Sequence, residues 1–229
     1  MLTNLRQANQ TIVLYAAHKN LKGYKCMINY QKELDKLTAD IENSQKRPRL
    51  LLHSCCAPCS SYVLDYLYKW FDITVYYYNP NIYPYDEYIK RKNEQLRLIK
   101  EFNLEGKKFD FIDADYNCDT FIKLSEGLES EPEGQNRCHK CYEFRLKRTA
   151  ECAKEYNYDF FATTLTVSPY KNAQIINNIG AKIEAQFGVK YLYSDFKKKN
   201  GYLRSIELSK QYNLYRQNYC GCMFSMHNS

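Results

Sequence analysis

From about residue 49 onward, short apolar runs alternate with longer stretches of amphipathic pattern. Residues 50–53 and 73–78 have the length and apolar content of buried strands. Between them, Pro58 opens a stretch whose apolar residues recur at helical spacing. Strands that alternate with helices in this way predict an α/β fold, with a parallel sheet and helices on both of its faces.

The predicted elements follow one another at short intervals. Five strands are expected, the last being the weakest, at residues 50–53, 73–78, 108–112, 159–164 and 191–193. Helices are expected at residues 58–70, 86–102, 117–125, 138–156 and 172–187, and at the start of the tail after residue 202. The stretch 126–135, which contains Glu and Gly, is predicted to be a loop.

The first 48 residues do not continue this alternation. Within them, only residues 30 to about 41 have the pattern of an amphipathic helix. We therefore expect an N-terminal helical extension at 1–48 and an α/β domain at 49–229. No apolar run approaches the ~20 residues that span a bilayer, and the N-terminus lacks the pattern of a secretory signal. A cytoplasmic protein without a membrane partner is expected.

Ten cysteines change this picture. A reducing cytosol disfavours structural disulfides, so clustered cysteines there more often bind metal or carry out redox chemistry. Six of the cysteines form three pairs. They are the adjacent pair Cys55 and Cys56, the C-x-x-C pair Cys138 and Cys141, and the C-x-C pair Cys220 and Cys222.

Several of these motifs stand at the ends of predicted strands. Residues 54–59 follow the first strand, 79–81 the second, and 163–169 the fourth. Ligands bind beyond the carboxyl ends of the strands in such sheets. The first cysteine pair and the polar segments are therefore expected at one functional edge.

Two cysteine pairs supply four thiolates, which suits either a tetrahedral zinc site or an iron–sulfur cluster. Spacing alone does not separate these two centres. Arg137 and Lys140 flank the second pair and would stabilise its thiolates. Cys59 is either a further ligand or a bystander. The isolated cysteines are expected to be small buried hydrophobes: Cys26, Cys118 and Cys152.

The C-x-C pair differs in kind. A disulfide across one intervening residue closes a small strained ring, and strained disulfides are more easily reduced. Gly221 provides the backbone freedom that such a turn needs. We favour a redox-active dithiol of Cys220 and Cys222 over metal ligation by either sulfur.

The formal net charge of +7 permits a polyanionic partner without requiring one. Residues 190–218 combine seven basic side chains with two acidic ones and six interleaved aromatic ones. Such a stretch is either an RNA contact, with phosphate-binding cations and base-stacking rings, or an ordinary solvated surface. The predicted substrate contacts are Lys197, Lys198, Arg204 and Arg216. No glycine-rich phosphate loop is present, so ATP use is not indicated.

Together these motifs resemble the QueH family of epoxyqueuosine reductases. The resemblance covers about residues 49–225 and rests on the order of several segments. These are residues 53–59, 78–82, 138–146, 161–165, 168–172, 196–198, 201–205 and 215–222.

The resemblance implies a HUP-like (Rossmann-like) fold and a cobalamin-independent reaction. In that reaction epoxyqueuosine at the tRNA wobble position loses its epoxide oxygen, which completes queuosine formation. The implied partners are the anticodon stem-loop of tRNA and an unidentified electron donor. The candidate proton donors for this reaction are Tyr219, His53 and water. The implied [4Fe-4S] ligands are Cys55, Cys56, Cys138 and Cys141, the redox-active pair is Cys220 and Cys222, and Cys59 is a possible contact of a second iron.

Two other functions compete with this interpretation. A tRNA sulfur-transfer enzyme would act on the same partner, but it would normally need ATP, and the missing phosphate loop argues against it. A zinc-stabilised RNA-binding module would use the same cysteines without catalysis.

Overall fold

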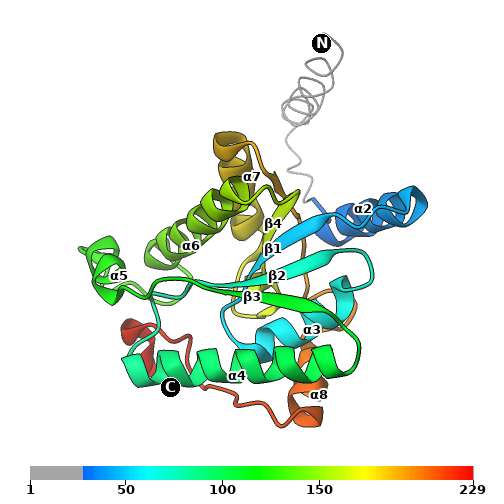
Figure 1. Ribbon diagram of the computed structural model, residues 1–229. Helices are drawn as coiled ribbons and strands as arrows, with labels where there is room; N and C mark the ends of the chain where they lie inside the picture. Colours follow the sequence, from blue (N-terminus) through cyan, green and yellow to red (C-terminus); the bar gives the residue numbers. More distant parts are fainter. Residues whose placement is uncertain (1–27, 229) are drawn as a thin grey trace.

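The computed structural model describes residues 28–228, and its centre is a five-stranded, all-parallel sheet (Figure 1). The strand order is β3-β2-β1-β4-β5. The strands are β1 (Arg49–His53), β2 (Asp72–Tyr77), β3 (Phe109–Asp113), β4 (Phe160–Thr163) and β5 (Lys190–Tyr191). The predicted α/β class and parallel sheet are confirmed. Cys26 and the other residues of the 1–27 stretch lie outside the described part of the chain.

Helices cover both faces of this sheet. In Figure 1, α6 and α7 lie on one side of the strands, and α3, α4 and α8 lie on the other. The helices are α2 (Tyr30–Ser44), α3 (Ala57–Leu67), α4 (Tyr85–Leu104), α5 (Cys118–Ser125), α6 (Asn136–Glu155), α7 (Ala173–Phe187) and α8 (Gly201–Gln211). Two 3₁₀ helices, η1 (Thr164–Val167) and η2 (Met223–Asn228), complete the described elements.

The alternation of side chains along β1 creates two separate cores. Leu50 and Leu52 point into the core that contains α3, α4 and α8 residues, whereas Leu51 points into the core beneath α6 and α7. Successive residues of a strand face opposite sides of a sheet, so a strand buried on both faces is apolar throughout. This is why residues 50–52 form a continuous leucine run.

Helix α2 is confirmed close to its predicted limits. Asn29 caps it, with its side chain accepting a hydrogen bond from the Lys32 amide. Leu34 and Ile41 pack into the same core as α3 and α8. The described part of the N-terminal segment therefore shares its apolar burial with the α/β domain.

The fifth strand is the shortest. β5 consists of Lys190 and Tyr191 only, slightly earlier than predicted, and Tyr191 pairs with Phe161 of β4. No helix within residues 28–228 is long and apolar enough to cross a membrane.

Replacing Leu51 with alanine tests how far the sheet core supports the fold. Leu51 is fully buried in the central strand, so L51A should lower the free energy of unfolding by about 2–5 kcal/mol. Leu104 is 80% exposed, and L104A should change that free energy by less than about 0.5 kcal/mol. Urea unfolding of both variants gives the comparison, and equal losses would contradict the assigned core.

Candidate metal and redox centre

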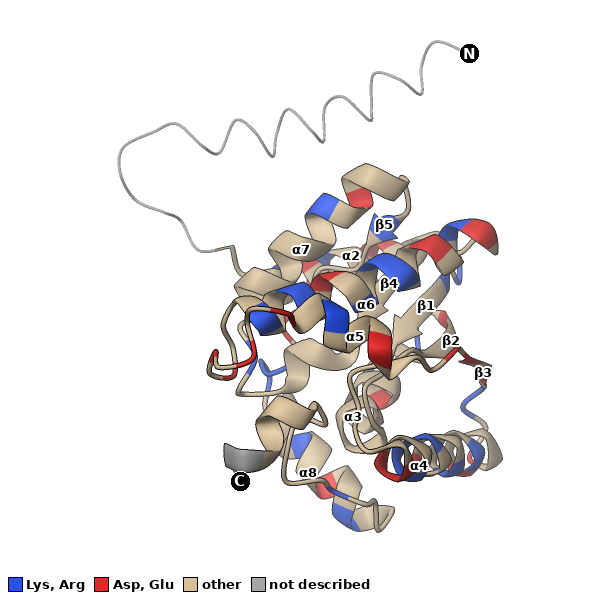
Figure 2. Ribbon diagram, turned by 90° about the vertical axis from the view of Figure 1, so that its left-hand side faces the viewer, with Lys and Arg blue, Asp and Glu red and all other residues tan. Residues whose placement is uncertain are grey.

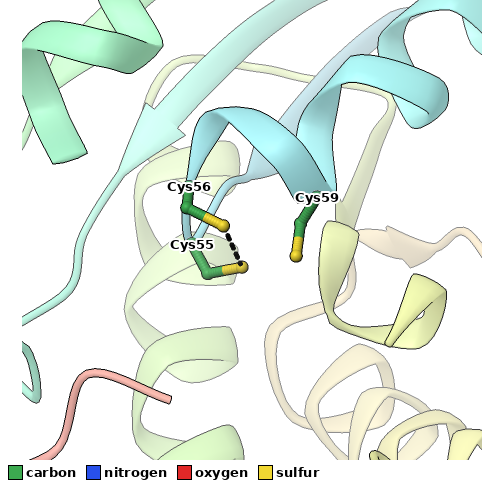
Figure 3. A group of neighbouring side chains, drawn as sticks. All are labelled: Cys55, Cys56 and Cys59. Carbon is green, nitrogen blue, oxygen red and sulfur yellow. Dashed lines mark hydrogen bonds between the residues drawn. The ribbon is translucent and has the colours of Figure 1, made fainter. Parts of the chain in front are cut away.

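Three cysteine sulfurs converge where β1 passes into α3. The Sγ atoms of Cys55, Cys56 and Cys59 all lie within 4.8 Å of one another, and those of Cys55 and Cys56 are 3.7 Å apart (Figure 3). Cys56 is the N-cap residue of α3, and Cys59 lies on the first turn of that helix. Residues three apart on a helix share a face, so Cys59 points back towards the adjacent pair. The structure therefore groups Cys59 with the first cysteine pair.

The three thiols share hydrogen bonds, which sets their acidity. Hydrogen bonds from Cys56 and Cys59 hold the pKa of Cys55 well below its usual range. The hydrogen bond to Cys55 raises the pKa of Cys56 to about 12. Hydrogen bonds with Cys55 and Cys56 raise the pKa of Cys59 well above its usual value. Hydrogen bonding among the three thiols thus favours a thiolate at Cys55, and a bound cation would favour deprotonation of the other two.

A second group of thiols lies around a small cavity beside α6. Cys138 and Cys141 line a cavity of about 10 Å³ together with Cys220 and Cys222. This volume is close to the minimum for a single water. The backbone N–H of Gly134 donates to Cys138 Sγ at 3.2 Å, and burial raises the pKa of Cys141 to about 12. The second and third predicted pairs are thus brought together.

A larger cavity of about 490 Å³ adjoins the first group of thiols. Its lining residues include Cys55, Cys59 and Cys220. Cys220, Arg145 and Glu133 line both this cavity and the small one. The two groups of thiols are therefore next to cavities that share these three lining residues. The larger cavity has the volume of a small-molecule site.

The C-terminal cysteine pair is held against α4. The buried Arg91 guanidinium donates to the carbonyls of Cys220 at 3.2 Å and Tyr219 at 3.4 Å. It also lies over the Tyr219 ring and forms an ion pair with Glu87 at 2.7 Å. Gly221 has a φ of 108°, and a Cβ atom there would lie 2.8 Å from Arg91 Nη1. The predicted need for glycine at this position is confirmed.

Two polar side chains that the sequence analysis gave no chemical role also approach the sulfurs. Lys171 Nζ lies 3.6 Å from Cys220 Sγ and 3.5 Å from Glu133 Oε1. Burial works against its charge, but Cys220 and other nearby acidic groups outweigh it and raise the pKa of Lys171 well above its usual value. Gln217 Nε2 donates to Cys56 Sγ at 2.9 Å. Lys171 and Gln217 lie in the segments 168–172 and 215–222, which contribute to the family resemblance.

His53 does not fit the role of proton donor. Its ring is fully buried, with Nδ1 at 3.0 Å from Thr163 Oγ1 and Nε2 at 3.2 Å from the Tyr78 carbonyl. Burial lowers the pKa of His53 to about 3, so the ring is neutral near pH 7. Its hydrogen bonds instead tie the ends of β1, β2 and β4 together.

The basic residues predicted to contact substrate have different surroundings. Lys197 is engaged by the Thr166 and Lys171 carbonyls and by Asp195. Arg204 pairs with Glu207 on α8, where basic and acidic positions alternate (Figure 2), and Lys198 is exposed. Among the four predicted contacts, Arg216 lines the large cavity.

The isolated cysteines in the described part behave differently from one another. Cys152 is buried in the core beneath α6, as expected, whereas Cys118 is half-buried at the start of α5. All nine described cysteines are free thiols.

A parallel sheet whose carboxyl edge carries clustered thiols beside a cavity defines an α/β protein whose thiols could hold a metal ion. The family model described as epoxyqueuosine reductase QueH matches residues 50–228. The chain therefore belongs to the QueH family.

Similar proteins cover most of the chain. A Staphylococcus epidermidis protein named epoxyqueuosine reductase QueH is 46% identical over 222 residues, which covers 96% of this chain and 90% of that protein. A protein of the same name from Streptococcus pyogenes is 45% identical and covers 86% of this chain and 78% of its own. The Thermotoga maritima protein of that name is 37% identical, with 77% and 90% covered.

Substitution of Arg91 by glutamine should release the C-terminal cysteine segment. R91Q removes the donors to Tyr219 and Cys220 and leaves the Glu87 carboxylate, which is 11% exposed, without its cation. Breaking such a pair costs about 3–5 kcal/mol. Urea unfolding should show that loss, and hydrogen exchange should quicken at residues 215–222.

The double variant E87Q/R91Q is the matched control. It removes the unpaired carboxylate, so global stability should partly recover while exchange at residues 215–222 stays fast. Unchanged exchange in R91Q would rule out the anchoring role.

Proposed function

We propose that this protein is an epoxyqueuosine reductase that converts epoxyqueuosine at the tRNA wobble position to queuosine in the cytoplasm. The observation that carries the proposal is the cavity of about 490 Å³, whose lining includes Cys55, Cys59 and Cys220. The names of the relatives supply the reaction.

The thiols also suit the proposed cofactor. Cys55 and Cys56 would hold a [4Fe-4S] cluster together with Cys138 and Cys141, which line the small cavity beside Arg145 and lie outside the group of three close sulfurs. A thiolate donor set favours zinc or iron–sulfur centres over hard cations. The Sγ atom of Cys59 lies within 4.8 Å of the Sγ atoms of Cys55 and Cys56, which supports a contact to an additional iron. When bound, such a cluster supplies electrons one at a time.

The Cys220–Cys222 pair accounts for the electron balance. Removing the epoxide oxygen as water consumes two electrons and two protons and leaves a carbon–carbon double bond. Oxidation of two thiols to one disulfide releases two electrons and two protons. The pair and the cluster therefore suffice without cobalamin, and an external electron donor must then reduce the disulfide.

The unequal exposure of the two cysteines supports different roles for them in this scheme. Cys220 is half-buried and lines both cavities, whereas Cys222 is buried and lines the small one only. Burial raises the pKa of the Cys222 thiol. Cys220 is thus the sulfur nearer the substrate, and Cys222 is its disulfide partner.

The anticodon loop would approach the mouth of the large cavity. Arg216 and the 78% exposed Tyr170 both line this cavity. A guanidinium can contact a phosphate, and a tyrosine ring can stack on an unpaired base. Lys198 and Arg204 are exposed and can add phosphate contacts. Lys197 would contribute indirectly, by donating hydrogen bonds to the Thr166 and Lys171 carbonyls and so holding that loop in place. The proton source is water or Tyr219, whose hydroxyl donates to the Tyr83 carbonyl.

Analysis of nucleosides from cells tests the reaction itself. Bulk tRNA from cells that lack this protein should accumulate epoxyqueuosine and lose queuosine, because the last reduction is blocked. Mass spectrometry of digested tRNA measures both nucleosides, and re-expression of the wild-type chain should restore queuosine. Normal queuosine in the deletion strain, with no other reductase present, would exclude the function.

Substitution of Cys138 by alanine tests the cofactor. C138A should lose iron, sulfide and the iron–sulfur absorbance together with turnover, whereas C152A on the same helix should keep them because Cys152 lies in the core. C220S should keep the iron and lose turnover. Anaerobic purification with metal and sulfide analysis gives the result. A colourless protein with stoichiometric zinc would favour the RNA-binding module instead.

A further inference from the structure

Arg145 is a buried cation at the centre of the thiol site. Its side chain is 2% exposed, and it lines both the small and the large cavity. It lies on α6 seven residues after Cys138 and four after Cys141, so all three share one face of the helix.

The hydrogen bonds of Arg145 leave part of its guanidinium unused. Nε donates to the Cys141 carbonyl at 3.4 Å, and Nη1 donates to Asn79 Oδ1 at 3.3 Å. Nη2 is buried and has no hydrogen-bond partner within residues 28–228. The Asn79 amide in turn donates to the Ser54 carbonyl at 2.8 Å, next to Cys55. Arg145 therefore connects the second cysteine pair to the loop that carries the first.

The charge of Arg145 also lacks a carboxylate partner in the described part of the chain. The neighbouring Lys171 has Glu133, and the buried Arg91 has Glu87. A buried charge without a counter-ion costs several kcal/mol. Burial opposes the charge of Arg145, but the nearby thiols of Cys141, Cys220 and Cys55 outweigh it and raise the pKa of Arg145 above its usual value. Glu133 lines the same two cavities but pairs with Lys171, so within residues 28–228 the cysteine thiols are the main source of counter-charge for Arg145.

We propose that Arg145 is a positioning residue that balances the negative charge of a thiolate-ligated cofactor and raises the reduction potential of that cofactor. The inference rests on the proposed function, because it assigns Arg145 to the cluster held by the two cysteine pairs. Reduction adds one negative charge to such a centre. A fixed cation at its wall stabilises the reduced form more than the oxidised form.

The variants R145Q and R145K separate charge from hydrogen bonding. R145Q removes the charge and keeps a hydrogen-bonding group, whereas R145K keeps the charge without the guanidinium fork. R148Q is the matched control, because Arg148 lies one turn further along α6, is 47% exposed and pairs with Asp115. All variants are purified anaerobically as full-length protein and assayed for iron and sulfide.

A redox titration followed by electron paramagnetic resonance measures the reduction potential of each variant. R145Q should be reduced at least tenfold less favourably than the wild type, which is about 59 mV for a one-electron couple. R145K should lie closer to the wild type, and R148Q should match it. If R145Q loses iron while R145K retains it, the requirement for charge is supported.

Other outcomes overturn the inference. Equal potentials in wild type and R145Q at full iron content would exclude the electrostatic role and leave the proposed function intact. Loss of iron from both R145Q and R145K would make Arg145 an architectural residue only. A wild-type protein without iron and sulfide would exclude the cofactor and the inference together.

Discussion

The parallel alignment of β1 with β2 and β4 is the constraint on which the site depends. His53 at the end of β1 is in register with Tyr76 of β2 and Thr163 of β4. Its buried ring then bonds to Thr163 and to the Tyr78 carbonyl, which fixes where all three strands end. The first cysteine, Cys55, follows two residues after His53, so its position is set by the sheet. Segments 25 and 110 residues away from His53 meet there.

The repeating parts of this structure could be predicted from the sequence. The leucine run at residues 50–52 reflects a strand that is buried on both faces of the sheet. The helical spacing after Pro58 reflects a helix with one buried face. Both patterns can be read directly from neighbouring residues. The convergence of Cys55 and Cys56 with the strand ends followed from the same rule. β5 begins one residue before its predicted start at residue 191, because a strand of two residues has too little pattern to fix its limits.

The individual side chains of the site could not be predicted in this way. Arg91, Arg145 and Lys171 sit on helices or loops among many other basic residues, and their burial arises from contacts made far along the chain. A basic residue in a sequence likewise does not reveal whether groups of the protein itself already bind its charge. Lys197 belongs to a basic stretch, yet backbone carbonyls and Asp195 surround its ammonium group.

The unequal exposure of the C-terminal cysteine pair has a consequence for the order of events. Cys220 opens onto the large cavity, while Cys222 is covered. On the proposed function, the reductant that regenerates the dithiol has to reach Cys220 through the space that the wobble nucleoside fills. The RNA and the reductant would then bind one after the other. The product RNA would dissociate before the disulfide is reduced, so turnover would follow a ping-pong mechanism.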